Sequence, residues 1–128
     1  MTVTLKLFVD PNAPGSQQLT HDLEKQVRAL GTGTVESKKG TPPEGTLTDP
    51  HTVLLVVKLT YYSLKVALAL IAIARDVRER HAAEKKQKLE NVAPIFITVE
   101  GDTTATLSVP GSAKDEQQFL STAKDKEA

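Results

Sequence analysis

Apolar and polar residues alternate over residues 3–9, which is the pattern of a strand with one buried face. After a loop rich in proline and glycine, apolar residues recur at helical spacing. They are Leu19, Leu23, Val27 and Leu30. This spacing predicts a helix with one apolar stripe, with Ser16 as its N-cap and Gly31 just past its end. A weak strand over residues 32–38 follows.

The segment 50–74 is the most apolar part of the chain. Asp49 followed by Pro50 is typical of an N-cap and a first helical residue. The β-branched run 53–57 also suggests a strand. Because the apolar character persists far beyond the usual length of a strand, one long helix is favoured. The charged stretch 75–90 then either extends this helix into solvent or serves as a linker.

The last part of the chain predicts a β-hairpin and a short helix. Residues 94–100 and 103–109 form the strands, and Gly101-Asp102 suits the turn between them. Residues 112–123 predict a helix that docks Phe119 and Leu120 on the sheet. Residues 122–128 are small and polar, and we expect a frayed tail.

Together these elements predict a single α+β domain over residues 1–128, with the order β-α-β-α-β-β-α. The long apolar helix would lie at its centre, packed on a mixed or antiparallel sheet. Residues 78–92 would form a charged helix extension or a linker.

The predicted central helix has an apolar arc much wider than the roughly 100° stripe that a surface helix buries. A second surface must cover the rest of the arc: another helix of the domain, a second copy of the chain, or a partner. Small residues on one side permit close approach of another helix, and a narrow polar face lies beside them. The candidate contact residues are Thr60, Ser63, Ala67 and Ala74, with Lys58, Tyr62 and Lys65 on the polar face.

Membrane insertion of this helix is possible by length but not favoured. Lys58 and Lys65 interrupt the apolar window 52–74. Each lysine at mid-span costs roughly 2.5–3.5 kcal/mol. The first residues lack the pattern of a signal peptide, and we expect a cytoplasmic protein.

Composition and motifs argue against catalysis. The 16 Lys and Arg residues balance the 16 Asp and Glu residues, so the overall positive field of most nucleic-acid binders is missing. Without cysteine there is no thiolate zinc site and no cysteine nucleophile. His21, His51 and His81 match no metal-ligand spacing, and we expect them in solvent. Nucleophile-elbow, phosphate-loop and dinucleotide motifs are missing too, which predicts a non-enzymatic protein with no metal or cofactor.

Basic residues cluster in the charged stretch: Arg75, Arg78, Arg80, Lys85, Lys86 and Lys88. Acidic residues alternate with them, so a solvated charged helix is favoured over a phosphate-binding stripe. We therefore expect no nucleic-acid partner.

The order of elements, the connection Pro42-Pro43-Glu44-Gly45 and the apolar helix that ends in arginine at 68–75 resemble the effector-associated constant-component domains of bacterial conflict systems. The resemblance spans residues 3–120 and rests on architecture and spacing. It implies a small non-enzymatic adaptor that couples a sensor to an effector in defence. A protease or a signalling ATPase would be its partner.

Two other functions stay open. A structural or membrane-associated subunit would self-assemble through the same helix. We expect a homo-oligomer both for this subunit and for the adaptor. A small-ligand-binding domain of ferredoxin-like shape would need a defined pocket.

Overall fold

The computed structural model describes residues 3–43, 46–60, 62–100 and 104–124. It contains five strands, three α-helices and one short 3₁₀ helix. In chain order they are β1 (Val3–Val9), α1 (Ser16–Leu30), β2 (Thr34–Gly40), β3 (Thr52–Leu59), α2 (Leu64–Glu84), η1 (Leu89–Asn91), β4 (Ile95–Glu100), β5 (Ala105–Val109) and α3 (Ala113–Lys124).

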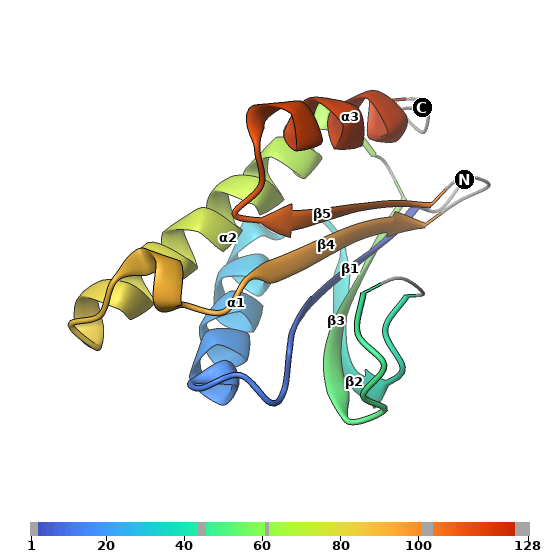
Figure 1. The fold of residues 1–128 in the computed structure, drawn as a ribbon. Coiled ribbons are helices and arrows are strands. Elements are labelled where there is room, and N and C mark those ends of the chain that lie inside the picture. The colour runs from blue at the N-terminus through green and yellow to red at the C-terminus, as the bar shows by residue number, and fades with distance from the viewer. Residues whose placement is uncertain (1–2, 44–45, 61, 101–103, 125–128) are drawn as a thin grey trace.

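The strands form one antiparallel sheet in the order β2-β3-β1-β4-β5. The central strand β1 pairs with β3 on one side and with β4 on the other, so that Leu5 lies opposite both Val57 and Val99. All three helices lie on one face of the sheet, with α2 between α1 and α3 (Figure 1). This confirms the α+β class, and of the two predicted alternatives, a mixed or an antiparallel sheet, the sheet is antiparallel.

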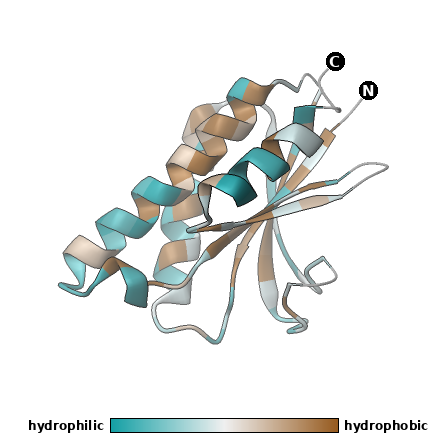
Figure 2. Ribbon diagram, turned by 45° about the horizontal axis from the view of Figure 1, so that its top comes forward, coloured by the Kyte–Doolittle hydropathy of each residue, from teal (hydrophilic) through white to brown (hydrophobic). Residues whose placement is uncertain are grey.

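The main core fills the space between the helices and the sheet. Alternate residues of the strands, such as Leu5 and Leu7, point into it and meet the apolar stripe of α1 at Leu19 and Leu23. In Figure 2 hydrophobic residues lie along the strands and in the half of α2 that begins the helix, whereas the other half of α2 and much of α3 are hydrophilic. Burial of alternate strand positions against helical stripes is the ordinary way such a layer is stabilised.

A second, smaller core lies on the other face of the sheet. Phe8, Leu54 and Val56 are buried there, with Leu47 of the connection between β2 and β3 packed on them. The rings of Phe8 and Phe96 stack with their centroids 5.3 Å apart. Strand β3 is therefore covered on both faces.

The prediction of one long apolar helix from Pro50 is wrong. Residues 52–59 are strand β3, and α2 begins only at Leu64. A strand buried on both faces has a continuous apolar run rather than alternation, which sequence periodicity does not separate from a buried helix. The order of the other predicted elements is kept, with β3 added before α2.

The two predicted helix N-caps also differ from the structure. Asp49 begins the turn before β3, where its Oδ1 accepts a hydrogen bond from the His51 backbone N–H at 2.8 Å. The N-cap of α1 is Gly15, in the left-handed region at φ 74°, and the Ser16 hydroxyl donates to the Pro11 carbonyl at 3.0 Å. Gly31 does end α1 as predicted.

The hairpin and the last helix are confirmed as elements. The strands β4 and β5 pair from Ile95 opposite Val109 to Val99 opposite Ala105. The predicted turn at Gly101-Asp102 lies outside the described residues, as do Glu44 and Gly45. Helix α3 buries Phe119 and continues to Lys124, so the first residues of the predicted tail are helical, and 125–128 lie outside the described part.

Candidate interaction surfaces

The seven predicted contact residues do not share one surface. Ala67, Ala74 and Tyr62 are buried in the domain's own core. The other four are exposed or half-buried, but they belong to different elements: Lys58 to β3, Thr60 and Ser63 to the segment before α2, and Lys65 to the first turn of α2. The prediction of a common face assumed one helix through all seven positions. Because Lys58 lies on β3 and α2 begins only at Leu64, the seven residues do not share a helix face.

The outer side of α2 carries an exposed ridge that we call the α2 ridge. Its members follow at spacings of three or four residues, which places them on one face of the helix. They are Lys65, Leu68, Ala72, Arg75 and Glu79. Leu68 keeps 50% of its surface exposed and, with Leu89, is one of two large apolar side chains so exposed within the described residues.

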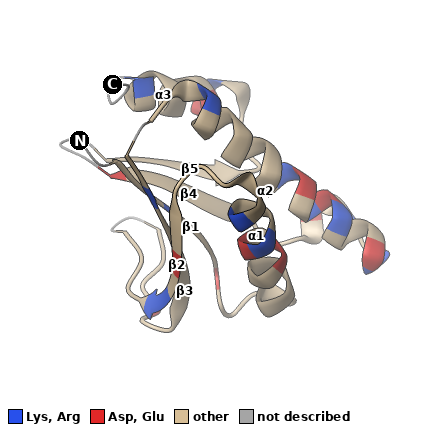
Figure 3. Cartoon of the chain, turned by 180° about the vertical axis from the view of Figure 1, so that it is seen from behind, with Lys and Arg blue, Asp and Glu red and all other residues tan. Residues whose placement is uncertain are grey.

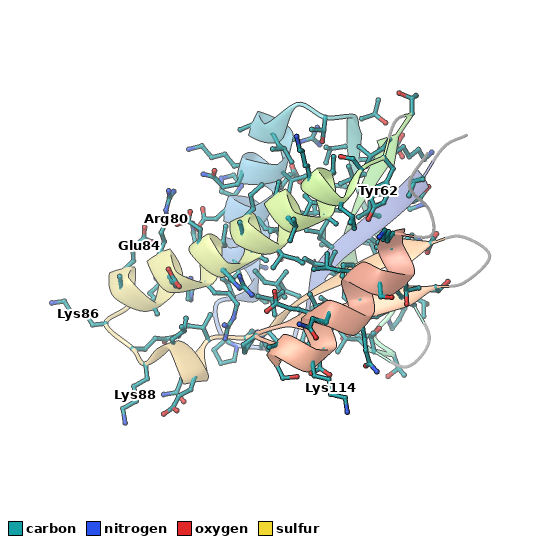
Figure 4. All side chains as sticks on the ribbon, turned by 90° about the horizontal axis from the view of Figure 1, so that it is seen from above. Tyr62, Arg80, Glu84, Lys86, Lys88 and Lys114 are labelled. Carbon is teal, nitrogen blue, oxygen red and sulfur yellow. The ribbon has the colours of Figure 1, made fainter. Side chains whose placement is uncertain are left out.

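Charge along α2 is strongly divided. The half that begins the helix is apolar, and charged residues fill the half that extends beyond the end of the sheet (Figure 3). Figure 4 shows Arg80, Glu84, Lys86 and Lys88 pointing away from the body of the domain. Residues 75–84 belong to α2, and the helix ends at Glu84.

Arg78 departs from the prediction of a solvated basic cluster. Its side chain is buried with 4% exposed, and it donates hydrogen bonds to the carbonyls of Ala93 at 3.0 Å and Val92 at 2.9 Å. A third bond reaches the Leu89 carbonyl at 3.2 Å. Burial lowers the pKa of the Arg78 guanidinium from its usual value. The guanidinium thus fastens η1 and the segment between η1 and β4 to α2.

Other members of the basic cluster make ion pairs at the surface. Arg75 pairs with Glu116 and so links α2 to α3. Arg80 pairs with Asp76 one turn earlier at 3.0 Å. Such pairs are typical of a solvated helix face and confirm the expectation for these two arginines.

Two of the three histidines are exposed and the third is buried. His21 and His51 are exposed as predicted, and with Lys39 they line a pocket of about 400 Å3 between α1 and the sheet. His81 is buried, which corrects the expectation. It lies seven residues after Ala74 and four after Val77, so it continues the buried stripe of α2, and that spacing was the signal in the sequence. No group of three metal-ligating side chains is found among the described residues.

Asp49 connects two loops at the same end of the sheet. Its Oδ2 accepts a hydrogen bond from Asn12 Nδ2 at 3.0 Å, and its Oδ1 accepts the bond from His51. The His51 backbone bond, and to a lesser extent the Asn12 bond, lower the pKa of the Asp49 carboxyl. The contact joins the loop after β1 to the turn before β3.

A groove of about 520 Å3 runs beside β5, and we call it the β5 groove. Strand β5 is one edge of the sheet, and α3 lies alongside it (Figure 1). The lining residues come from β5 and the residue before it, from α3, from β4 and from the connection after β2. They are Thr46, Phe96, Thr104, Ala105, Thr106, Leu107, Ser108, Asp115, Gln118, Phe119 and Thr122.

Sequence reasoning found the strand and the helix that border this groove, but not the groove. Which strand lies at an edge depends on pairings between distant segments, and these are set by the whole sheet. Local patterns carry no signal for that position.

No protein-family model, no curated protein and no solved structure matches this chain. In the part of the chain that the structure describes, none of the helices combines the length and hydropathy needed to cross a membrane.

Proposed function

We propose that this chain is a non-enzymatic interaction module of the cytoplasm that couples a sensor to an effector in a bacterial conflict system. The proposal combines the resemblance in element order with one structural observation. That observation is the α2 ridge, where Leu68 projects into solvent beside Ala72. A large apolar side chain held on a packed helix is a ready anchor for a partner's pocket.

The position of Leu68 supports a role in binding rather than in folding. Its neighbours Ala67, Leu70 and Ile71 supply the buried face of α2, so the domain does not need Leu68 for its core. The ridge offers an anchor at Leu68 with a small residue one turn later, which is how a helix enters an apolar groove. Lys65 at one end favours a partner whose groove has an acidic rim.

The partner is a protease or a signalling ATPase. A direct test is to purify the tagged chain from its native host with and without Leu68→Lys. The matched control is Leu89→Lys, because Leu89 is 42% exposed but lies on η1, away from the ridge. We expect near-stoichiometric recovery of the partner with the wild type and the control. Recovery with Leu68→Lys should fall at least about tenfold, the equivalent of about 1.4 kcal/mol.

Equal recovery of the partner with Leu68→Lys and Leu89→Lys would mean that the partner does not bind through the α2 ridge. Recovery of the chain alone as a defined oligomer would favour the second candidate, a self-assembling subunit that uses the same ridge. In that case Leu68→Lys should dissociate the oligomer in sedimentation measurements, whereas Leu89→Lys should not.

A further inference from the structure

The two edges of the sheet differ in how they are protected. Strand β2 carries Glu36, Lys38 and Lys39, and charged side chains on an edge discourage pairing with another strand. Strand β5 has no charged residue and no proline among its five residues. Within the described residues β5 pairs only with β4, so the backbone N–H and C=O groups on its outer side have no strand partner in the sheet.

The β5 groove follows this free edge rather than one face of the strand. Leu107 belongs to the helix side of the sheet and Thr106 to the opposite side, and both line the groove. Phe119 and Gln118 of α3 form one wall, and Thr46 lies on the other side. Five residues of β5 provide about 17 Å of edge at roughly 3.4 Å per residue, which is the usual length of a strand.

We propose that the β5 groove binds an extended segment of a partner protein, which pairs with β5 as a sixth strand of the sheet. Main-chain hydrogen bonds to β5 give the affinity, and α3 and Thr46 select the side chains. The inference rests on the proposed function in that it requires a partner. It uses a surface distinct from the α2 ridge, which gives an adaptor two separate contacts.

A second copy of this chain does not fit the same place. Helix α3 packs on β5 and borders the groove. If two copies of β5 paired antiparallel, both α3 helices would lie on the same face of the joined sheet, above strands only about 4.8 Å apart. Packed helices need about 8–10 Å between their axes. The entering strand must therefore come without a helix beside it, as a peptide-like segment does.

The lining side chains define the chemistry of that segment. Leu107 and Phe119 are buried, so residues that point toward α3 meet mainly Ala105 and the polar side chains of Gln118 and Thr122, which favours small polar side chains at these positions. Residues on the opposite side meet the hydroxyls of Thr46, Thr106 and Ser108, which favours small polar side chains. Asp115 is the one charged residue among the described lining residues, so lysine or arginine is favoured near it and acidic residues are disfavoured.

The test selects peptides from a displayed library of random twelve-residue sequences on the wild-type chain, with Ser108→Lys as the counter-selection. Ser108 is half-buried on β5, and lysine there places a charge on the open edge. The matched control is Ser37→Lys on the opposite edge, where Ser37 is exposed. We expect selected peptides that are rich in small polar residues and poor in acidic ones. Their Kd should rise at least about tenfold with Ser108→Lys, which removes strand pairing at the edge.

N-methylated forms of a selected peptide give a readout that does not depend on folding of the variant. Backbone N-methylation should abolish binding at every second residue only, because alternate N–H groups of a strand point toward its neighbour. Ser37→Lys and Leu68→Lys should leave the peptide Kd within about twofold, so failure at the β5 groove and failure at the α2 ridge are distinguishable.

Four results would overturn the inference. One is a library from which no peptide is enriched, and another is enriched peptides that bind Ser108→Lys as tightly as the wild type. A third is binding that is insensitive to N-methylation or loses the period of two. The last is a dimer of the chain that Ser108→Lys dissociates, because a second copy would then occupy the edge.

Discussion

In each half of α2, some residues differ in burial from what the hydropathy of that half predicts. Residues 64–74 are almost entirely apolar, yet Leu68 projects into solvent. Residues 75–84 are mostly charged, yet Arg78 and His81 are buried. The first half lies over the sheet, which covers one side of it, and the second half extends beyond the sheet (Figure 1). There the chain supplies other contacts: η1 through Arg78, and the start of α1 through His81 and Gly15.

The difference teaches that a charged segment is not always a solvated one. A buried guanidinium with three carbonyl acceptors holds a connection that has few apolar groups of its own. An exposed leucine on the apolar half is then surplus to folding and available for binding. Charged residues of α2 thus supply structural contacts beside those of its buried apolar residues, and our proposal assigns the binding role to Leu68.

The largest expected effect comes from Arg78→Ala in the charged half. It removes three hydrogen bonds and leaves the buried carbonyls of Val92 and Ala93 without their donor, which we expect to cost about 3 kcal/mol. The control is Arg80→Ala, which removes only an exposed ion pair with Asp76 and should cost less than about 0.5 kcal/mol. Urea unfolding of both variants measures the difference. Equal midpoints and slopes would mean that Arg78 does not anchor η1.

Ala67→Leu in the apolar half has the next largest effect. Ala67 is fully buried, and added methylenes in a packed core cost about 2 kcal/mol. Ala72→Leu places the same side chain on the exposed ridge and should change stability by less than about 0.5 kcal/mol. Thermal unfolding compares the two. If Ala67→Leu were as stable as Ala72→Leu, that side of α2 would not be packed in the domain.

Gly15→Ala tests the contact between the charged half and the start of α1. A Cβ at Gly15 would lie 2.8 Å from His81 Nε2, whereas one at Gly31 would meet nothing within 4 Å. Both glycines have positive φ, at 74° and 68°, so alanine strains the backbone in either place. We expect Gly15→Ala to cost about 1 kcal/mol more than Gly31→Ala because of the clash.

A variant without the His81 side chain tests whether the clash causes this difference. In a His81→Ala background the two glycine substitutions should have equal effects, since the side chain that would be struck is gone. A difference that persists without His81 would place the strain elsewhere in the loop.

Local patterns were sufficient for much of the fold. Alternation predicted β1, and helical spacing with Gly31 predicted α1. The hairpin of β4 and β5 and the helix α3 also follow from short segments. Helices α1 and α3 and strand β5 each have one buried face, so their periodicity is visible in the sequence. Strands β1 and β4 show enough alternation to be predicted, although Phe8 and Thr98 are buried on their second face.

The elements and residues that were missed depend on contacts between distant segments. Strand β3 is buried on both faces because Leu47 and Phe8 cover its second face, and no local pattern shows this. Arg78 is buried because η1 and the residues after it place the carbonyls of Leu89, Val92 and Ala93 beside α2. The seven predicted contact residues lie apart because residues 52–59 form β3, and helical spacing does not describe the positions of side chains in a strand.

The central claim is that Leu68 serves a partner rather than the fold. The most direct test is the amount of partner recovered with Leu68→Lys from preparations whose unfolding free energy is measured in urea. The account predicts a loss of recovery of at least about tenfold, with stability within about 0.5 kcal/mol of the wild type. Undiminished recovery, or a loss accompanied by an equal loss of stability, would contradict it.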